Sequence, residues 1–600
     1  MSELLVSCFR DVNLTEEVER IDSIPNISRN YVECWKLSTE IFVSDVLTPI
    51  VFYIGFGIDF PYSMPSFYFP SLQFGYLPHV ESVGGKLCLF EDGTSFDPKD
   101  ASEMILFCIK KAKRLIKEGA EKQNTGDFLS EITSYWTRRY NDEPEVKETF
   151  FINNSIPTTT SILNAISYAV PVSGLKRKDT IVNTLLYCSD EEPFDSYLSR
   201  NFDTKNGKVL FVSGFNANHI APYNLNFAAF LNHLLDKEEQ KKVKSFINAH
   251  QGGQIFFKLT ENRIGGIEVK PVRLQRNGFR NGSLSTCDVY LNFEEKTTNL
   301  TRLFGCLYSK ERIAERTFGE LMQKQNFLVA GLGSIGSNLV HFLNGNNNVS
   351  FTLVDKEVLT VDNVGRHLLG YRYVNQFKVC AIIDYLRSKR PEQKNNFGIT
   401  SIQNYIGGNF QKLSEYTALF LCTGDTMTDE YIIDAVNNGE LTIPVFIIWL
   451  EPFGAAGHMV YINPNSFHKP LSINNALTKL YIHNVISDAE YKSQENHFTK
   501  RDAGCNGVYA LYSDNDVLLM LSAFYPIINR LLTEPEESTC YRWVGNIKRI
   551  FQKGISVNIA PGNTGVEIAP TAEDVAGFDA YIETYKAGLA IEQAAVANKK

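Results

Sequence analysis

The feature that most constrains this 600-residue chain is a short apolar run that ends in a glycine-rich turn. Residues 327–330 are all apolar and are closed by a glycine, which predicts a buried parallel strand. The turn contains Gly331, Gly333 and Gly336 and leads into a segment that we expect to be helical from near Ser337. Glycines let the backbone approach a phosphate, and a helix start offers unpaired N–H groups. The pattern therefore predicts a nucleotide on a Rossmann-like sheet.

The residues after the next predicted strand indicate which nucleotide chemistry is involved. That strand, residues 350–354, ends on Asp355, whose carboxylate can hold ribose hydroxyls. Asn363, Arg366 and Lys378 follow. Hydride transfer creates no charge on a phosphate, so a dehydrogenase leaves the two basic residues unexplained. Splitting ATP at its α-phosphate places charge on the leaving pyrophosphate, which basic groups must neutralise. We therefore favour adenylation over hydride transfer.

A third predicted strand, residues 418–423, is followed by Gly424 and Asp425. A carboxylate at the carboxyl end of a parallel strand is well placed for Mg²⁺. The order of these motifs resembles the adenylation domain of ubiquitin-activating enzymes and of the bacterial relatives that activate ThiS and MoaD, over roughly residues 305–545. The resemblance implies that Asp425 holds Mg²⁺ and that ATP is bound by Gly331, Gly333, Gly336, Asp355, Asn363, Arg366, Lys378 and Asp425.

A cysteine lies just before a strongly apolar helix predicted at residues 516–532. A thiolate near a helix N-terminus has a lowered pKa and suits attack on an acyl-adenylate. Relatives carry their thioester-forming cysteine here, which implies that role for Cys505, although Asn506 stands where the family often has threonine. Cys540, after the helix, is the competing candidate.

Two arginines, Arg312 and Arg316, precede the nucleotide strand. In homodimeric relatives an arginine of this region reaches the partner's ATP. The resemblance therefore implies a homodimer and leaves the choice between the two arginines open.

The N-terminal region contains another cysteine of interest. We expect a short capped helix from Leu14, a strand meander, and Cys88 in an irregular loop after His79 and a glycine turn. Such a loop favours a reactive thiol, whereas a buried small hydrophobe is the alternative. The stretch Gly85-Lys-Leu-Cys-Leu resembles the ubiquitin-conjugating fold, which implies that Cys88 is catalytic. The family's His-Pro-Asn-Val is Leu-Pro-His-Val here, so the family's asparagine is absent. In the family that asparagine steadies the oxyanion that forms when a lysine attacks the thioester, and we assign this role to His79.

The expected fold class is α/β multidomain. Residues 1–145 form an α+β ubiquitin-conjugating-like domain, and residues 146–304 form an α/β spacer or docking domain without a catalytic constellation. Residues 305–560 form a Rossmann-like ThiF-type adenylation domain, and residues 561–600 are an alanine-rich tail.

Composition excludes several other classes. A net charge of −9 without a long basic run argues against nucleic acid as a partner. Eleven cysteines without CxxC pairs predict reduced thiols in the cytoplasm and no structural zinc. No run approaches the roughly 18 uncharged apolar residues of a membrane span, and the N-terminus lacks a signal-peptide pattern.

The domain order resembles bacterial fusion proteins of CBASS anti-phage operons, the CD-NTase-associated proteins. The resemblance implies ATP-dependent ligation: a protein C-terminus is adenylated, captured as a thioester on Cys505, passed to Cys88, and joined to a lysine by an isopeptide bond. In that family the activated protein is the operon's cyclic-nucleotide synthase, the CD-NTase, which is thereby primed for antiviral defence.

Two alternatives stay open. The chain could be a ThiF-like activator of a sulfur-carrier or ubiquitin-like protein for cofactor synthesis, which needs no Cys88. It could also be a degenerate binding module that only recognises a partner's tail, although the intact charged positions speak against this.

Overall fold

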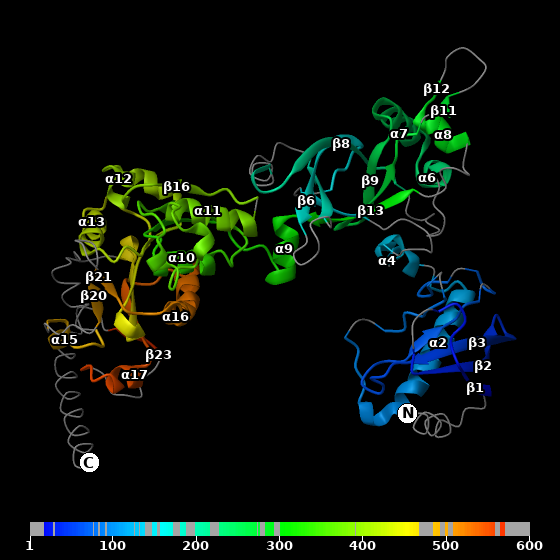
Figure 1. Cartoon of the computed structure of the whole chain (residues 1–600), viewed down its shortest axis with the longest axis horizontal. Coiled ribbons are helices and arrows are strands. Elements are labelled where there is room, and N and C mark those ends of the chain that lie inside the picture. Colours follow the sequence, from blue (N-terminus) through cyan, green and yellow to red (C-terminus); the bar gives the residue numbers. More distant parts are fainter. Residues whose placement is uncertain are drawn as a thin grey trace. The chain divides into compact units, whose positions relative to one another are not determined.

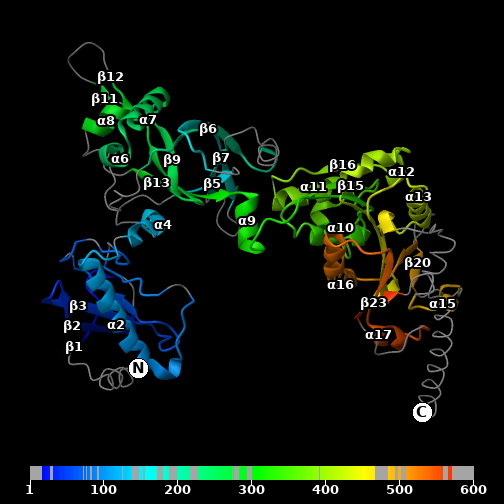
Figure 2. The ribbon, with the colours of Figure 1, turned by 180° about the vertical axis from the view of Figure 1, so that it is seen from behind.

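A computed structural model of the chain (Figure 1) describes residues 17–569 apart from 28–30, 72, 76, 82–83, 91–92, 125, 131, 138–146, 153–155, 172–179, 188–198, 216–226, 273, 276–282, 293–299, 391, 467–483, 493–497, 502–507 and 558–564. The chain divides into two compact units. The first comprises residues 1–190 and 202–309, and the second comprises residues 191–201 and 310–600. Figure 2 shows the same elements from behind. Each unit is described by itself below.

The N-terminal region is an antiparallel sheet with one long helix packed on it. Helix α2 (Ala101–Ala120) presents an apolar side that repeats at helical spacing. Its buried residues, Ile105 and Ile109 among them, pack against Phe52 and Ile54 of the sheet. The strand order is β1 (Glu17–Ile21), β2 (Glu33–Val43), β3 (Val46–Phe56), β4 (Ser66–Tyr68).

The helix expected from Leu14 is wrong over its described part. Residues 17–21 form strand β1, which pairs with β2. Val18 is half-buried against the core of this domain, and Glu19 makes an ion pair with Lys36 across the two strands, with 3.3 Å between the charged atoms. Cross-strand pairing therefore outweighs the local preference for a helix.

The middle of the chain forms a closed barrel. Helix α4 (Ile132–Thr137) packs on it, because Trp136 donates its indole N–H to the carbonyl of Leu303 (2.7 Å) and lies against Phe257. The helices of this part are α6 (Phe227–Leu234), α7 (Lys237–His250) and α8 (Thr286–Asn292). The strands follow the order β10 (Arg263–Val269), β13 (Thr301–Tyr308), β5 (Lys147–Ile152), β7 (Thr180–Tyr187), β6 (Ser161–Pro171), β8 (Thr204–Val212), β9 (Gly253–Thr260).

The second unit is built on an eight-stranded sheet. The strand order is β16 (Asn396–Gly398), β15 (Val349–Val354), β14 (Gln325–Ala330), β17 (Ala418–Leu421), β18 (Val445–Leu450), β19 (Ala456–Ile462), β22 (Thr539–Val544), β23 (Gly565–Ala569). The first five strands are parallel, and the last three pair antiparallel. Strand order reverses at β14, so a crevice opens at the carboxyl ends of β14 and β17, where such sheets bind ligands.

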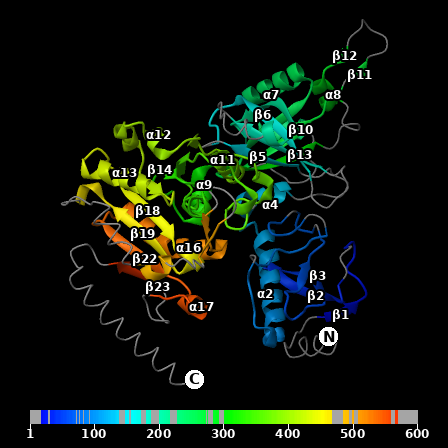
Figure 3. The same cartoon turned by 60° about the vertical axis from the view of Figure 1, so that its left-hand side comes forward.

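Helices cover both faces of this sheet. Phe327 and Val329 of β14 face α10 (Ser334–Leu343), α11 (Lys378–Lys389) and α16 (Asp514–Thr533), whereas Leu328 faces α12 (Ile402–Ile406) and α13 (Thr426–Asn437). Figure 3 shows α13 and α16 on opposite sides of the sheet. Successive side chains of β14 therefore pack into two different hydrophobic cores, as expected for a strand that is buried on both faces.

The remaining elements are short. They are α3 (Asp127–Ser130), β11 (Leu274–Gln275), β12 (Ser283–Leu284), α9 (Lys310–Thr317), α15 (Asp488–Lys492), β20 (Thr499–Arg501), β21 (Val508–Ala510) and α17 (Ile547–Gln552).

Helix α16 is long and apolar enough to cross a membrane, and it is the one such helix among the described residues. Its side chains Val517, Phe524 and Ile528 are fully buried in the core of the second unit. The core helix of a globular domain shows the same burial. The length and apolar composition of α16 are therefore weak evidence for a membrane-spanning segment.

Candidate active site

The glycine turn after β14 lies against the end of β17. Gly331 has φ +82, and a Cβ there would lie 2.8 Å from backbone atoms of Cys422 and Thr423. A Cβ on Gly336 would collide with the carbonyl oxygen of Gly331. Gly331 therefore needs glycine for both conformation and space, and Gly336 needs it for space. The helix α10 begins at Ser334, three residues earlier than expected, with Gly333 as its N-cap.

Asp355 holds this turn in place. Its carboxylate accepts the N–H of Leu332 (2.6 Å) and the N–H of Glu357 (2.8 Å), and the residue is buried. The expected contact of Asp355 with a ribose stays a prediction. The same carboxylate fixes the backbone of the glycine turn through the N–H of Leu332.

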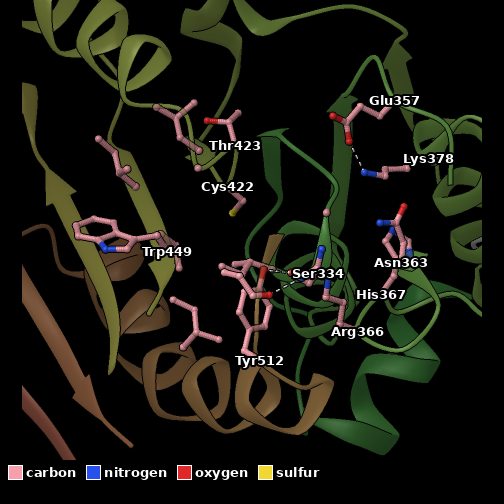
Figure 4. Close-up of a pocket in the computed structure, with 18 of the residues that line it drawn as sticks. Ser334, Glu357, Asn363, Arg366, His367, Lys378, Cys422, Thr423, Trp449 and Tyr512 are labelled. Carbon is pink, nitrogen blue, oxygen red and sulfur yellow. Dashed lines mark hydrogen bonds and ion pairs between the residues drawn. The ribbon is translucent and has the colours of Figure 1, made fainter. Parts of the chain in front are cut away.

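Two neighbouring cavities open at this edge of the sheet. The first has a volume of about 450 Å³ and contains Asn363, Arg366 and Tyr512 in its wall. The second has a volume of about 400 Å³ and contains Asp355 and Asp425. Figure 4 shows residues that line the first cavity. The two cavities share five lining residues, which are Gly333, Glu357, Lys378, Cys422 and Thr423.

Lys378 lies in the wall common to both cavities. It is the first residue of α11, its side chain is only 5% exposed, and its ammonium group lies 2.6 Å from the carboxylate of Glu357 (Figure 4). Glu357, in contrast, is 62% exposed. A buried ammonium at a helix N-terminus needs an anion beside it. The exposed carboxylate supplies that anion here.

Arg366 is held by two contacts. One terminal nitrogen donates to the carbonyl of Ala510 (2.9 Å), and the guanidinium carbon lies 5.3 Å from the ring centre of Tyr512. The side-chain oxygen of Asn363 accepts from the N–H and the hydroxyl of Thr360, each at 3.1 Å, so its amide nitrogen remains for the cavity.

His367 lines the same cavity but is not a candidate base. Burial lowers the pKa of its imidazole to about 4, against the opposing effect of its backbone hydrogen bonds. Its Nε2 donates to the carbonyl of Leu332 (2.9 Å), and its Nδ1 accepts from the N–H of Leu369 (3.0 Å). The neutral ring thus stabilises the glycine turn through its hydrogen bond to Leu332.

Two carboxylates one helical turn apart begin α13. Asp425 is the exposed N-cap and accepts from the N–H of Met427 (3.2 Å) and the hydroxyl of Thr428 (2.6 Å). Asp429 is buried and lines the first cavity. Burial, with a contribution from Asp425, raises the pKa of Asp429 to about 7. Sequence reasoning missed Asp429, whose only signal was its spacing from Asp425.

A divalent cation fits these carboxylates. Among the described residues, no group of three or more His, Cys, Asp or Glu side chains could hold a metal ion by itself. Mg²⁺ is commonly bound by one or two carboxylates together with substrate phosphates, so Asp425 and its neighbour Asp429 match that donor set. A cation beside them would also offset their mutual repulsion.

The cysteine candidates differ in accessibility. Cys505 lies outside the described residues. Cys540 lies in β22, where burial raises the pKa of its thiol to about 12. Burial likewise raises the pKa of Cys422, which sits at the end of β17. A thiol that resists ionisation is a poor nucleophile, so the structure disfavours Cys540.

Cys88 is exposed, in a segment tied to His79. The N–H of Cys88 donates to the carbonyl of His79 (2.8 Å), and Val80 pairs with Leu87 between them. His79 adopts φ +60, which is uncommon for a residue with a Cβ, and its Nε2 lies 3.0 Å from a carboxylate oxygen of Asp127. The structure therefore brings His79 and Cys88 together through the backbone, and Asp127 is an addition that the sequence did not suggest.

Both arginines that precede the nucleotide strand lie on α9. Arg316 is exposed and Arg312 is half-buried. Their proposed contact with a partner's ATP stays a prediction.

Comparison with family models identifies the fold of the N-terminal region. Residues 32–144 match the family model described as Prokaryotic E2 family B, E2 being the ubiquitin-conjugating class. This confirms the ubiquitin-conjugating-like fold expected for the N-terminal region. The mixed α/β sheet of the second unit confirms the Rossmann-like fold expected there.

Solved structures also show similarity. The SeMet PaaA structure is 12% identical over 57% of this chain and 85% of that one, with a TM-score of 0.29. E. coli MccB with ATP is 12% identical over 40% and 64%, with a TM-score of 0.27. The E. coli tRNA N6-threonylcarbamoyladenosine dehydratase TcdA with AMP is 19% identical over 23% and 58%, with a TM-score of 0.20. A comparison with curated proteins finds no match.

Proposed function

We propose that this chain is an ATP-dependent protein ligase that adenylates a protein C-terminus and transfers it to a lysine amine. The observation that carries the proposal is the pair of cavities that share Lys378 at the carboxyl ends of parallel strands. An exposed cysteine in an E2-like domain of the same chain supports the transfer half.

The second cavity suits the nucleoside, and the first suits the phosphates and the acyl group. Asp355 in the second cavity offers a carboxylate edge near the glycine turn. Lys378 in the shared wall and Arg366 in the first cavity offer positive charge on the path of the phosphates. Trp449 adds apolar surface for the end of an extended polypeptide.

In the first step, the carboxylate of a protein C-terminus attacks the α-phosphorus of ATP. A bond forms from carboxylate oxygen to phosphorus, and the bond to the β-phosphate breaks, so pyrophosphate leaves. Lys378 and Arg366 hold the developing charge, with the N–H groups at the start of α10. Mg²⁺ held by Asp425 together with Asp429, which lines the first cavity, would supply further neutralisation of the phosphates.

Cys505 then takes the acyl group. Its thiolate attacks the acyl carbon and AMP leaves, which conserves the activated bond as a thioester. Ala510, five residues further along the chain, lines the first cavity. Five residues span at most roughly 17 Å, so a position near the adenylate is within reach of the chain.

Cys88 receives the acyl group by thiol exchange, in which the thiolate of Cys505 leaves. A lysine amine of an acceptor protein then attacks the thioester, and the thiolate of Cys88 leaves as an isopeptide bond forms. We propose that His79 stabilises the oxyanion formed in this attack, and the hydrogen bond from the Cys88 N–H to the His79 carbonyl keeps the two residues adjacent. In line with the CBASS resemblance, we propose a CD-NTase as the activated protein, a homodimer as the assembly and the cytoplasm as the location.

The test is a non-reducing gel of the chain with Mg-ATP and the products of its neighbouring genes. Wild type, Cys505→Ala and Cys88→Ala are compared with and without added thiol. We expect a thiol-sensitive adduct that disappears in Cys505→Ala and accumulates on Cys505 in Cys88→Ala. Cys540→Ala, which removes a half-buried thiol in β22, is the matched control and should retain the adduct.

Two outcomes would contradict parts of the proposal. Full product formation by Cys88→Ala would favour activation of a sulfur-carrier or ubiquitin-like protein instead. An adduct that survives in Cys505→Ala and vanishes in Cys540→Ala would move the thioester to the other cysteine.

A further inference from the structure

The strongest feature that the proposed function does not use is the set of contacts around Tyr512. This residue stands between β21 and the start of α16 and is half-buried in the wall of the first cavity. Its hydroxyl lies 2.8 Å from the hydroxyl of Ser334, the first residue of α10 (Figure 4). The aromatic ring lies under the guanidinium of Arg366. One side chain therefore connects the helix start of the glycine turn with the arginine.

The position of Tyr512 is itself fixed on both sides. Ser513 caps α16 in a reciprocal capping box with Asp516. Asp514, the next residue, accepts a hydrogen bond from the amide of Asn338 of α10 (2.9 Å). The link from β21 to α16 is thus bound to α10 at Ser334 and at Asn338, which leaves the ring little freedom to move.

These contacts limit where the guanidinium of Arg366 can lie. One terminal nitrogen is bound to the carbonyl of Ala510, and the guanidinium carbon lies over the ring of Tyr512. Among the described residues, the guanidinium of Arg366 has no other hydrogen-bond partner, so its remaining N–H groups are available to a ligand in the cavity. An arginine held in this way loses less side-chain entropy when it binds a phosphate.

We propose that Tyr512 is a positioning residue that presents Arg366 to the phosphates of ATP. The proposal rests on the proposed function, because it requires the nucleotide to bind in these cavities. It goes further because it makes part of the affinity for the phosphates of ATP depend on the ring of Tyr512, which is distant in sequence from Arg366. Tyr512 touches no reacting atom in this scheme and acts through Arg366.

The test compares two ligands that differ only in their phosphates. Binding of α,β-methylene-ATP with Mg²⁺, and of adenosine, is measured by calorimetry on the full chain. In Tyr512→Leu we expect affinity for the phosphate-bearing ligand to fall about tenfold, the size of a partly desolvated cation–π contact, and affinity for adenosine to stay within about twofold. Tyr512→Phe keeps the ring and loses only the Ser334 contact, so it should retain most of the affinity.

A double-mutant cycle tests whether Tyr512 acts through Arg366. In an Arg366→Met background, Tyr512→Leu should cost no further affinity. Tyr525→Leu is the control, because it removes a half-buried tyrosine of α16 that packs on Phe342 away from the cavity. Should Tyr512→Leu fail to fold, Tyr512→Met and Tyr512→Phe carry the comparison.

The outcomes separate this inference from the proposed function. Wild type that binds neither ligand would overturn the proposed function and the inference with it. Wild type that binds both, with Tyr512→Leu unchanged or weakened equally for both, would overturn the role of Tyr512 alone. A loss in Tyr512→Leu that persists in the Arg366→Met background would also overturn it.

Discussion

At the scale of single residues, the site contains a buried charge whose partner is exposed. The ammonium of Lys378 is enclosed, whereas its carboxylate partner Glu357 is mostly in solvent. An exposed carboxylate is easily displaced, so a phosphate can take its place beside the lysine. We infer that Glu357 occupies the position of an anion until the nucleotide arrives.

Lys378→Met and Glu357→Gln should therefore have different effects. The first should change the rate of ATP consumption, and the second should change the stability of the nucleotide-free protein. Lys378→Met should lower the rate of ATP consumption about 10²- to 10³-fold, because it removes a fixed charge from the transition state. Glu357→Gln leaves the buried lysine unpaired, so it should lower the melting temperature of the nucleotide-free protein and enlarge the upward shift caused by α,β-methylene-ATP. Thermal unfolding with and without the ligand checks this, and an unchanged shift would contradict it.

Asp429 predicts a pH dependence of stability. Its pKa is raised from an ordinary value of 3.8 to about 7, so the folded state holds the proton more tightly than the unfolded state does. Stability contributed by this group is present below about pH 4 and is lost as the pH rises through about 7. Asp429→Asn cannot ionise, so its stability relative to wild type should increase across this window, by up to about 4 kcal/mol.

Urea unfolding of wild type and Asp429→Asn at pH 5 and pH 8 measures that difference. The other titrating groups are common to both proteins and cancel in the comparison. A difference in free energy of unfolding that is the same at both pH values would show that Asp429 does not titrate as inferred.

At the scale of elements, the turn between β14 and α10 is the most demanding piece of local structure. Its backbone reverses direction within van der Waals distance of the end of β17, and it adopts a left-handed conformation at Gly331. The closeness to the end of β17 leaves no room for a side chain at Gly331, whereas Gly333 of the same turn has room for one.

Gly331→Ala should therefore destabilise the second unit. The positive φ alone costs roughly 1–3 kcal/mol, and the contact with the backbone of Cys422 adds to it. Gly333→Ala is the matched control, because a Cβ there meets nothing within 4 Å and should cost less than about 1 kcal/mol. Denaturant unfolding of both variants distinguishes them, and equal losses would contradict the explanation.

At the scale of the whole molecule, the two proposed nucleophiles belong to different compact units. Cys88 lies in the unit that contains residues 1–190, and Cys505 lies in the unit that contains residues 310–600. Thiol exchange requires the two sulfur atoms to meet. We propose that they meet between protomers of a dimer.

A mixture of Cys88→Ala chains and Cys505→Ala chains should therefore regain part of the activity that each lacks alone. A mixed dimer pairs one intact Cys505 with one intact Cys88 across its interface. The yield of isopeptide product, measured after the two variants are co-refolded or co-expressed, checks this. No rescue would show that transfer occurs within one chain.

Much of the fold followed from local sequence patterns. The apolar run before Gly331 predicted a parallel strand, and β14 is that strand. The apolar pattern predicted the helix at residues 516–532, and α16 covers it. The short helix expected from Leu14 was wrong over residues 17–21, because a partner strand that is distant in sequence determines that segment.

The sequence by itself determined the motifs whose meaning is local: the glycine turn, the carboxylates at strand ends and the exposed cysteine after a tight turn. Backbone conformation and hydrophobic periodicity depend on a few neighbouring residues, so these features can be predicted from the sequence alone. Only the tertiary structure decided which other side chains reach the site. Tyr512 meets Ser334 across 178 positions, and Ala510 meets Arg366 across 144, because the strands and helices between them fold back onto one edge of the sheet. No local pattern records such a meeting, since it depends on how every intervening element packs.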